Sequence, residues 1–124
     1  MDASHFNAAV LQVVSMIPPQ RVMSCGHLAK LIGAPRQSRR VSEVVRFLAH
    51  TTPSAPWHRV ISTAGIIASH GGLGPIQRDA LEGEGVSVCN GILGEPRVRF
   101  DQWGWFPEHV GLDSDTESDD EWGA

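Results

Sequence analysis

Side chains that could do chemistry come closest together in one short stretch, Pro56-Trp57-His58-Arg59-Val60. A His–Arg pair suits an active site, and the place just before His58 suits a nucleophile. The residue there is an indole, which offers an N–H donor but no free lone pair, because its nitrogen lone pair belongs to the ring. Attack by a thiolate is excluded at this position, and Trp57 indicates a role in contact and packing.

The two cysteines, Cys25 and Cys89, lie far from this stretch and far from each other. We expect free thiols in a reducing compartment, with a disulfide between them as the alternative. A metal site built from Cys25, His27 and distant histidines is a weaker alternative, because two close ligands often occur by chance. No metal and no cofactor are expected.

Charge is divided unevenly along the 124 residues, whose net charge is −4. From residue 107 to the end there is no Lys or Arg, and the acidic residues are Glu108, Asp113, Asp115, Glu117, Asp119, Asp120 and Glu121. Without them the net charge is +3. Between residues 20 and 50 only Glu43 opposes the basic side chains, which are Arg21, Lys30, Arg36, Arg39, Arg40 and Arg46. The basic segment suggests an anionic partner, and a solvated basic face is the alternative.

The length and composition are those of one ordinary globular domain, to which we assign residues 1–107. Residues 108–124 have the composition of a disordered acidic tail. Apolar runs stay well short of the roughly 18 residues of a membrane span. The first residues lack the basic and apolar regions of a secretory signal. Neither a membrane span nor a secretory signal is expected.

Apolar spacing predicts two helices joined by a turn, after a first helix over residues 4–16 for which Ser4 is a possible cap. The first of the pair is SCGHLAKLIG, capped by Ser24 and ended by Gly33. The second is SRRVSEVVRFLAH, whose apolar side holds Val41, Val44, Val45 and Leu48. This is the pattern of a helix-turn-helix. Arginines at the start of the second helix favour nucleic acid as the partner.

The remaining segments predict a small β element and one more helix. IPPQRVMS is a Pro-broken connector, and HRVIS-TAG-IIAS suggests a hairpin or wing. GGLGP suggests a loop, IQRDALEGEG a helix ended by Gly85, and VSVCN and PRVRF short strands. We expect Trp103, Trp105 and Phe106 to pack back over the core. The fold class is therefore mainly α with a small β hairpin, of the helix-turn-helix, winged-helix-like type.

Four segments of the sequence resemble, in order, the DNA-binding domain of the O6-alkylguanine-DNA alkyltransferases. They are IPPQRVMSCGHLAKLIGAP, SRRVSEVVRFL, PWHRVISTAG and LEGEGV, within a resemblance covering about residues 6 to 107. Those enzymes carry Pro-Cys-His-Arg-Val, and the Cys takes the alkyl group. Trp57 in that place resembles the alkyltransferase-like proteins, which are not enzymes. The resemblance implies binding of O6-alkylguanine in double-stranded DNA by base flipping, without alkyl transfer, and delivery of the lesion to nucleotide excision repair.

The resemblance also implies roles for single residues. Arg39 matches the arginine finger that replaces the flipped base, with a phosphate contact as the alternative. The lesion pocket would be formed by Trp57, Pro56, Val45, Ile67, Ala68, Ser69, His70 and Gly71, although Trp57 could instead only fill the core. Contacts with the DNA backbone would come from Arg36, Arg40, Lys30 and Cys25. A structural remnant of the catalytic network would remain in His58, Arg59 and Glu84.

The sequence departs from the family pattern at two positions near the pocket. Cys25 stands where the family has a Tyr that helps to rotate the target nucleotide. His70 stands where an Arg of alkyltransferase-like relatives probes the modified base. The first departure puts assisted flipping in doubt, and the second leaves the preferred adduct open.

Two other functions and three roles of the tail stay open at this point. The chain could be a helix-turn-helix regulator without lesion specificity, or an enzyme with a different nucleophile. The tail could be a solubilising end, a docking segment for a nucleotide excision repair factor anchored by Trp122, or a competitor of DNA for the basic face. We expect a monomer, in the nucleus if the source is eukaryotic and otherwise in the cytoplasm.

Overall fold

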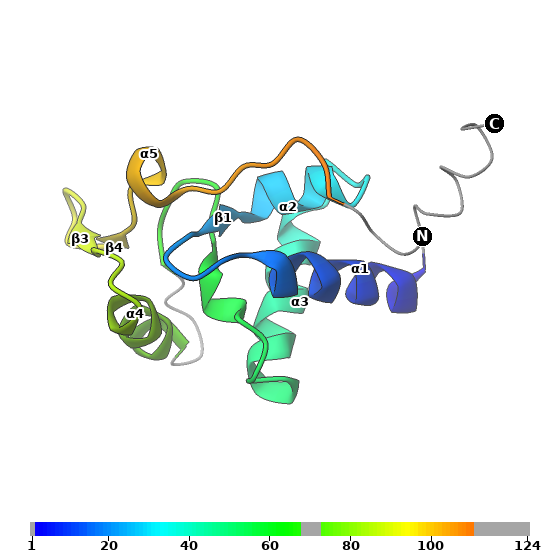
Figure 1. Cartoon of the computed structure of the whole chain (residues 1–124), viewed down its shortest axis with the longest axis horizontal. Helices are drawn as coiled ribbons and strands as arrows, with labels where there is room; N and C mark the ends of the chain where they lie inside the picture. Colours follow the sequence, from blue (N-terminus) through cyan, green and yellow to red (C-terminus); the bar gives the residue numbers. More distant parts are fainter. Residues whose placement is uncertain (1, 68–72, 111–124) are drawn as a thin grey trace.

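The computed structural model describes residues 2–67 and 73–110, and within them the chain is mostly helical (Figure 1). The elements in chain order are α1 (Ala3–Met16), β1 (Met23–Ser24), α2 (Cys25–Leu31), α3 (Ser38–Thr51), the 3₁₀ turn η1 (Trp57–Arg59), β2 (Val60–Ile61), α4 (Leu73–Gly83), β3 (Cys89–Asn90), β4 (Pro96–Arg97) and α5 (Phe100–Trp103). None of the helices in these two segments is long and apolar enough to cross a membrane. The predicted fold class is confirmed.

Helix α1 buries the apolar side that its sequence predicts, but it begins slightly earlier. Asp2, and not Ser4, is the cap, and its Oδ1 accepts a hydrogen bond of 2.9 Å from the N–H of His5. A carboxylate at this position satisfies a free N–H group of the first turn and is stabilised by the helix dipole.

The helix-turn-helix is confirmed, with the predicted cap and stop of its first helix. Ser24 Oγ accepts from the N–H of His27 at 3.0 Å, and Gly33 has φ +82°, a left-handed conformation in which glycine is unstrained. Helix α3 buries Val41, Val44, Val45 and Leu48. These side chains join the buried faces of α1 and α2 in the larger of two core clusters, which also contains Trp57.

The predicted wing between residues 58 and 69 is wrong as a two-stranded hairpin. Strand β2 pairs in parallel with β1, from the connector before α2, and brings Val60 beside Met23. A turn does close between Ser62 and Gly65, but the N–H of Ile67 donates to the carbonyl of Pro96 at 3.0 Å. The second arm therefore pairs with β4 and not with β2.

Helix α4 starts inside the segment predicted as a loop. It begins at Leu73, so Gly74 and Pro75 lie in its first turn, where proline lacks only an N–H that the helix does not use. The predicted stop is confirmed, since Gly85 follows the helix with φ +97°.

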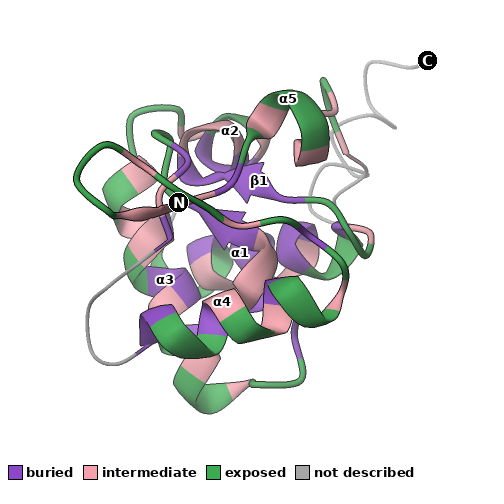
Figure 2. Cartoon of the chain, turned by 90° about the vertical axis from the view of Figure 1, so that its left-hand side faces the viewer, coloured by how far each residue is buried: buried purple, intermediate pink, exposed green. Residues whose placement is uncertain are grey.

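The predicted strands around residues 89 and 97 are confirmed as the antiparallel pair β3–β4, next to the second core cluster. The predicted packing of Trp103, Trp105 and Phe106 over the core is confirmed only in part. Gly104 forms a bridge with Val22, and Trp103 and Trp105 pack against the two core clusters, whereas Phe106 is 45% exposed. In Figure 2, β1 lies buried near the middle of the view, so the last part of the connector that the sequence presents as a loop belongs to the interior, whereas residues 19–21 are exposed.

Candidate nucleic-acid interface

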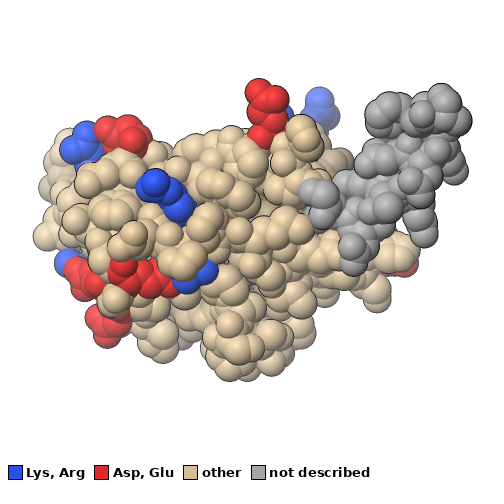
Figure 3. Space-filling view, in the orientation of Figure 1, with Lys and Arg blue, Asp and Glu red and all other residues tan. Residues whose placement is uncertain are grey.

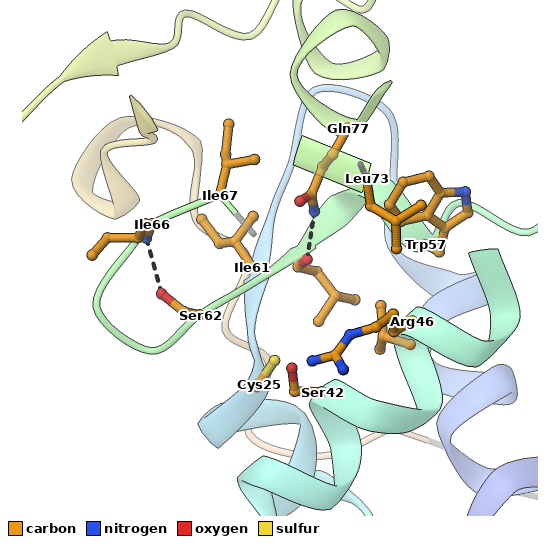
Figure 4. A pocket seen from close by; sticks show the side chains of 12 residues that line it. Cys25, Ser42, Arg46, Trp57, Ile61, Ser62, Ile66, Ile67, Leu73 and Gln77 are labelled. Carbon is orange, nitrogen blue, oxygen red and sulfur yellow. Dashed lines mark hydrogen bonds between the residues drawn. The ribbon is translucent and has the colours of Figure 1, made fainter. Parts of the chain in front are cut away.

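Trp57 forms part of the wall of a cavity of about 330 Å³, a volume typical of small-ligand sites (Figure 4). The 3₁₀ turn η1 presents the indole, which is 7% exposed and meets His58 edge-on at a ring-centroid distance of 6.3 Å. The cavity lies between α3, η1, β2 and the start of α4. Its lining residues are Cys25, Ser42, Val45, Arg46, Trp57, Val60, Ile61, Ser62, Ile66, Ile67, Leu73 and Gln77.

The structure gathers part of the predicted lesion pocket. Trp57, Val45 and Ile67 line the cavity together, whereas Pro56 precedes the indole as the cap of η1 and is not in the lining. The remaining predicted pocket residues lie outside the described residues, namely Ala68, Ser69, His70 and Gly71. The described wall is mostly apolar, which suits a planar ligand with few polar contacts.

His58, Arg59 and Glu84 form one hydrogen-bonded network behind Trp57, as the sequence predicts. His58 Nε2 and Arg59 Nη2 each lie 2.6 Å from Glu84 Oε2, and Arg59 Nε donates to the same carboxylate at 3.0 Å. Burial opposes ionisation of this carboxyl group, but the hydrogen bonds from Arg59 and His58 outweigh it and lower the pKa of Glu84 to about 2. Glu84 is therefore an anion that fixes the second and third residues of η1, the two that follow Trp57.

The same network ties η1 to the connector after α1. Arg59 Nη1 donates to the carbonyl of Ile17 at 2.8 Å. The N–H of Gln20 donates to Glu84 Oε1 at 3.2 Å, and its side-chain amide donates to the Glu84 carbonyl at 2.9 Å. Gln20 has φ +66°, which is strained for a residue with a Cβ. The network thus holds a strained connector as well as the turn that carries Trp57.

Sequence reasoning missed Gln77, which fixes the cavity from the α4 side. It is 2% exposed, and its Nε2 donates to the carbonyls of His58 at 3.0 Å and Val60 at 2.8 Å. The one signal for it in the sequence is helical spacing, since Gln77 lies four residues from both Leu73 and Leu81 on the buried side of α4.

The basic residues of the helix-turn-helix form no ion pair with any described acidic residue, whereas most of the other arginines do. Lys30, Arg36 and Arg39 are exposed and form no ion pair within the described segments. Arg40 is partly buried, with its guanidinium 4.1 Å from the centre of the Phe6 ring. To bind a phosphate, this guanidinium would have to contact the phosphate and the ring together.

At the other end of the molecule, basic side chains are neutralised by neighbours, in the pairs Arg78–Glu82, Arg97–Glu95 and Arg99–Asp101. The face shown in Figure 3 carries few basic side chains, most of them beside acidic ones. An anionic partner is therefore attracted to the α2–α3 side.

Cys25 begins α2 as the sequence predicts, but its side chain is buried. It is 8% exposed and lines the cavity, not a surface that faces a DNA backbone. Burial raises the pKa of its thiol to about 11, only partly opposed by a hydrogen bond with Ser42. Both cysteines are free, and no three His, Cys, Asp or Glu side chains of the described residues gather as metal ligands.

Iodoacetamide at pH 8 should alkylate Cys89 at least tenfold faster than Cys25. At that pH about one Cys25 thiol in a thousand is ionised, and the thiolate is the reacting form. Cys89 is exposed. Mass spectrometry of the two cysteine peptides over time measures the ratio, and the unfolded chain in guanidinium, in which both thiols react alike, is the control. Equal rates in the native protein would contradict the burial of Cys25.

Comparison with known proteins gives matches in both sequence and structure. The family model described as the 6-O-methylguanine DNA methyltransferase DNA-binding domain matches residues 5–86. Alkyltransferase-like protein 1 of Schizosaccharomyces pombe is 33% identical over 109 residues, which is 86% of this chain and the whole of that protein. The DNA base-flipping protein of Escherichia coli is 36% identical over 100 residues, 81% of this chain and 74% of that protein.

The fold agrees with these matches. The crystal structure of S. pombe Atl1 in complex with damaged DNA containing O6-carboxymethylguanine superposes with a TM-score of 0.80 at 32% identity, over 86% of this chain and all of that one. The chain therefore belongs to the 6-O-methylguanine DNA methyltransferase family, as an alkyltransferase-like member with Trp57 in the place of the nucleophile.

Proposed function

We propose that this chain binds duplex DNA carrying O6-alkylguanine, turns the modified base out of the helix into the cavity beside Trp57, and transfers no alkyl group. The observation that carries the proposal is the indole in the wall of a largely apolar cavity, next to a helix-turn-helix whose exposed Lys30, Arg36 and Arg39 form no ion pair with another described residue. The relatives support it, since one is named a base-flipping protein and another was crystallised with damaged DNA.

Contacts in the cavity can offset the free-energy cost of extruding a base without any alkyl transfer. Extruding a base costs a few kcal/mol, less where pairing is already damaged. Contact with an aromatic ring returns roughly 1–3 kcal/mol, and each buried alkyl carbon adds about 0.8 kcal/mol. A cavity walled by Trp57, Val45 and Leu73 provides both kinds of contact. An alkylated guanine gains more from this cavity than guanine does, and this difference is the source of selectivity.

We infer that no alkyl group is transferred, because none of the described residues that line the cavity is an activated nucleophile. Trp57 has no lone pair to donate. The Cys25 thiol has a pKa of about 11, so little thiolate exists at neutral pH. Mass spectrometry after incubation with alkylated DNA should show no lasting alkyl-sized gain in the mass of the protein, and a lasting gain would revive the alternative of a different nucleophile.

Equilibrium binding to two duplexes tests the proposal most directly. The duplexes are identical except for guanine or O6-methylguanine at one position, at near-physiological salt because phosphate contacts make affinity salt-dependent. We expect at least a tenfold preference for the modified duplex. Equal affinities would mean that Trp57 only fills the core, and a regulator without lesion specificity would become the leading hypothesis.

For the acidic tail we propose docking to a nucleotide excision repair factor. Its support is compositional: six acidic residues lie between 111 and 124, with one aromatic anchor at Trp122. The chain would act as a monomer, in the nucleus if its source is eukaryotic and otherwise in the cytoplasm. Deleting residues 108–124 should abolish capture of the repair factor and leave lesion affinity intact. Unchanged capture would refute docking, and tighter DNA binding at low salt would favour a tail that competes with DNA.

A further inference from the structure

Arg46 is the one charged side chain among the described residues that line the cavity. It projects from α3 and is partly buried. Figure 4 shows its guanidinium extended toward Cys25 and Ser42, along the side of the cavity formed by α2 and α3. It makes no hydrogen bond or ion pair with another described residue. A guanidinium held against an apolar wall without an anion is poised to bind one.

A nucleotide that enters this cavity brings its charge at one place, the phosphodiester. The neutral base suits the wall formed by Trp57, Val45 and Leu73, whereas a phosphate must stay at the mouth, near solvent. A guanidinium matches the phosphate oxygens with two parallel hydrogen bonds, and partial exclusion of water strengthens them. The neighbouring Cys25 thiol and Ser42 hydroxyl are neutral, so they do not supply the anion that the Arg46 guanidinium would pair with.

The position of Arg46 on α3 suits this task because of its register with Arg39. Seven residues separate the two, which is about two helical turns, so they share one helix face roughly 10 Å apart. Arg39 is exposed in the first turn, and Arg46 reaches the cavity. One face of α3 thus carries one exposed cation in its first turn and a second cation beside the cavity.

We propose that Arg46 binds a phosphate of the extruded nucleotide itself and so holds that nucleotide in the cavity. The inference rests on the proposed function, since it requires a flipped base. It differs from an ordinary backbone contact, because Arg46 contributes only when a nucleotide leaves the stack.

The test measures equilibrium binding of the full chain and of Arg46→Gln to four duplexes. One is unmodified, and one contains O6-methylguanine. The other two contain O6-methylguanine and a neutral methylphosphonate at the phosphate on either its 5′ or its 3′ side. Thermal unfolding confirms that each variant is folded. Arg78→Gln is the matched control, since it removes the same charge from an ion pair on α4.

We expect Arg46→Gln to bind the O6-methylguanine duplex about ten- to a hundredfold more weakly, and the unmodified duplex less than about threefold more weakly. One of the two methylphosphonates should weaken DNA binding by the natural chain by a similar factor. The same methylphosphonate should weaken binding by Arg46→Gln by no more than about twofold, because Arg46 and that phosphate form one interaction, which the substitution has already removed. Arg46→Lys should lie between, since it keeps the charge but loses the planar fork. Arg78→Gln should bind all four duplexes much as the natural chain does.

Each other outcome overturns the inference in a recognisable way. Equal weakening of modified and unmodified duplexes by Arg46→Gln would make Arg46 a general backbone contact. A loss in Arg46→Gln that neither methylphosphonate reproduces would mean that Arg46 contacts the base or its adduct. If Arg46→Gln keeps the natural preference, the inference alone fails. If the natural chain itself shows no preference, the proposed function fails and the inference falls with it.

Discussion

Replacing Arg39 with alanine should weaken binding to a duplex containing O6-methylguanine by about thirty- to a hundredfold, but binding to the unmodified duplex by only a few-fold. An extruded base leaves a gap in the stack, and filling that gap offsets part of the few kcal/mol that flipping costs. A planar cation can stack in the gap and donate hydrogen bonds at once. Because each 1.4 kcal/mol changes affinity tenfold, losing roughly 2–3 kcal/mol gives the expected range.

The structure leaves Arg39 available for this role. It lies in the first turn of α3, is exposed, and forms no ion pair in the described part of the chain. Arg36→Ala is the matched control, because Arg36 is an exposed arginine in the turn just before α3. Arg36→Ala should weaken binding to both duplexes by the same small factor. It should also reduce the steepness of the plot of log affinity against log salt concentration by about 0.9. If Arg39→Ala behaves like Arg36→Ala, Arg39 is a phosphate contact and not a finger.

Local sequence was enough to predict the elements that carry these arginines. Ser24 caps α2 with a bond to the N–H three residues on, and Gly33 takes the left-handed conformation that ends the unit. The apolar spacing of α3 matches its buried side. In each case the cause lies within one or two helical turns, which is the range over which periodicity and capping are visible in a sequence.

The wing was mispredicted because its partners are distant in the sequence. Val60 and Ile61 pair with a strand about 37 residues earlier, and Ile67 pairs with a residue 29 positions later. Two β-rich runs around a small turn predict a hairpin whenever no other partner competes. Here β1 and β4 both compete, and a two-residue strand gives too little pattern to reveal it.

The cavity could be predicted only in part. The resemblance identifies Trp57, Val45 and Ile67 as pocket residues, and all three line the cavity. The places of Gln77 and Arg46 in the cavity wall were not predicted, because a Gln or an Arg on an amphipathic helix is ordinarily a solvated residue. What gives them their roles is the angle at which α4 and α3 meet the cavity, and that angle is set by tertiary packing. For Arg46, the seven-residue spacing from Arg39 was the one signal available.

Replacing Glu84 with glutamine should destabilise the fold by about 2 kcal/mol near neutral pH. A pKa lowered from 4.5 to about 2 corresponds to roughly 3 kcal/mol, and partial contact of the carboxyl group with solvent screens some of it. The amide keeps the shape of the side chain but leaves the Arg59 guanidinium without its anion. Thermal unfolding should show a midpoint lower by about 5–10 °C. Glu82→Gln, which breaks an exposed pair in the last turn of α4, two residues before Glu84, should change stability by less than about 0.5 kcal/mol.

The stabilisation by Glu84 should depend on pH, and the direction follows from its lowered pKa. Because the pKa of Glu84 is lower in the folded chain than in the unfolded chain, its stabilisation is complete above about pH 5 and is lost as the pH falls from 4.5 toward 2. The gap in unfolding free energy between the natural chain and Glu84→Gln should therefore shrink steadily over that range. The exposed acidic groups titrate in both proteins and cancel in the difference. A gap that stays constant down to pH 2.5 would mean that the ionised carboxylate is not what holds η1, and with it Trp57, against α4.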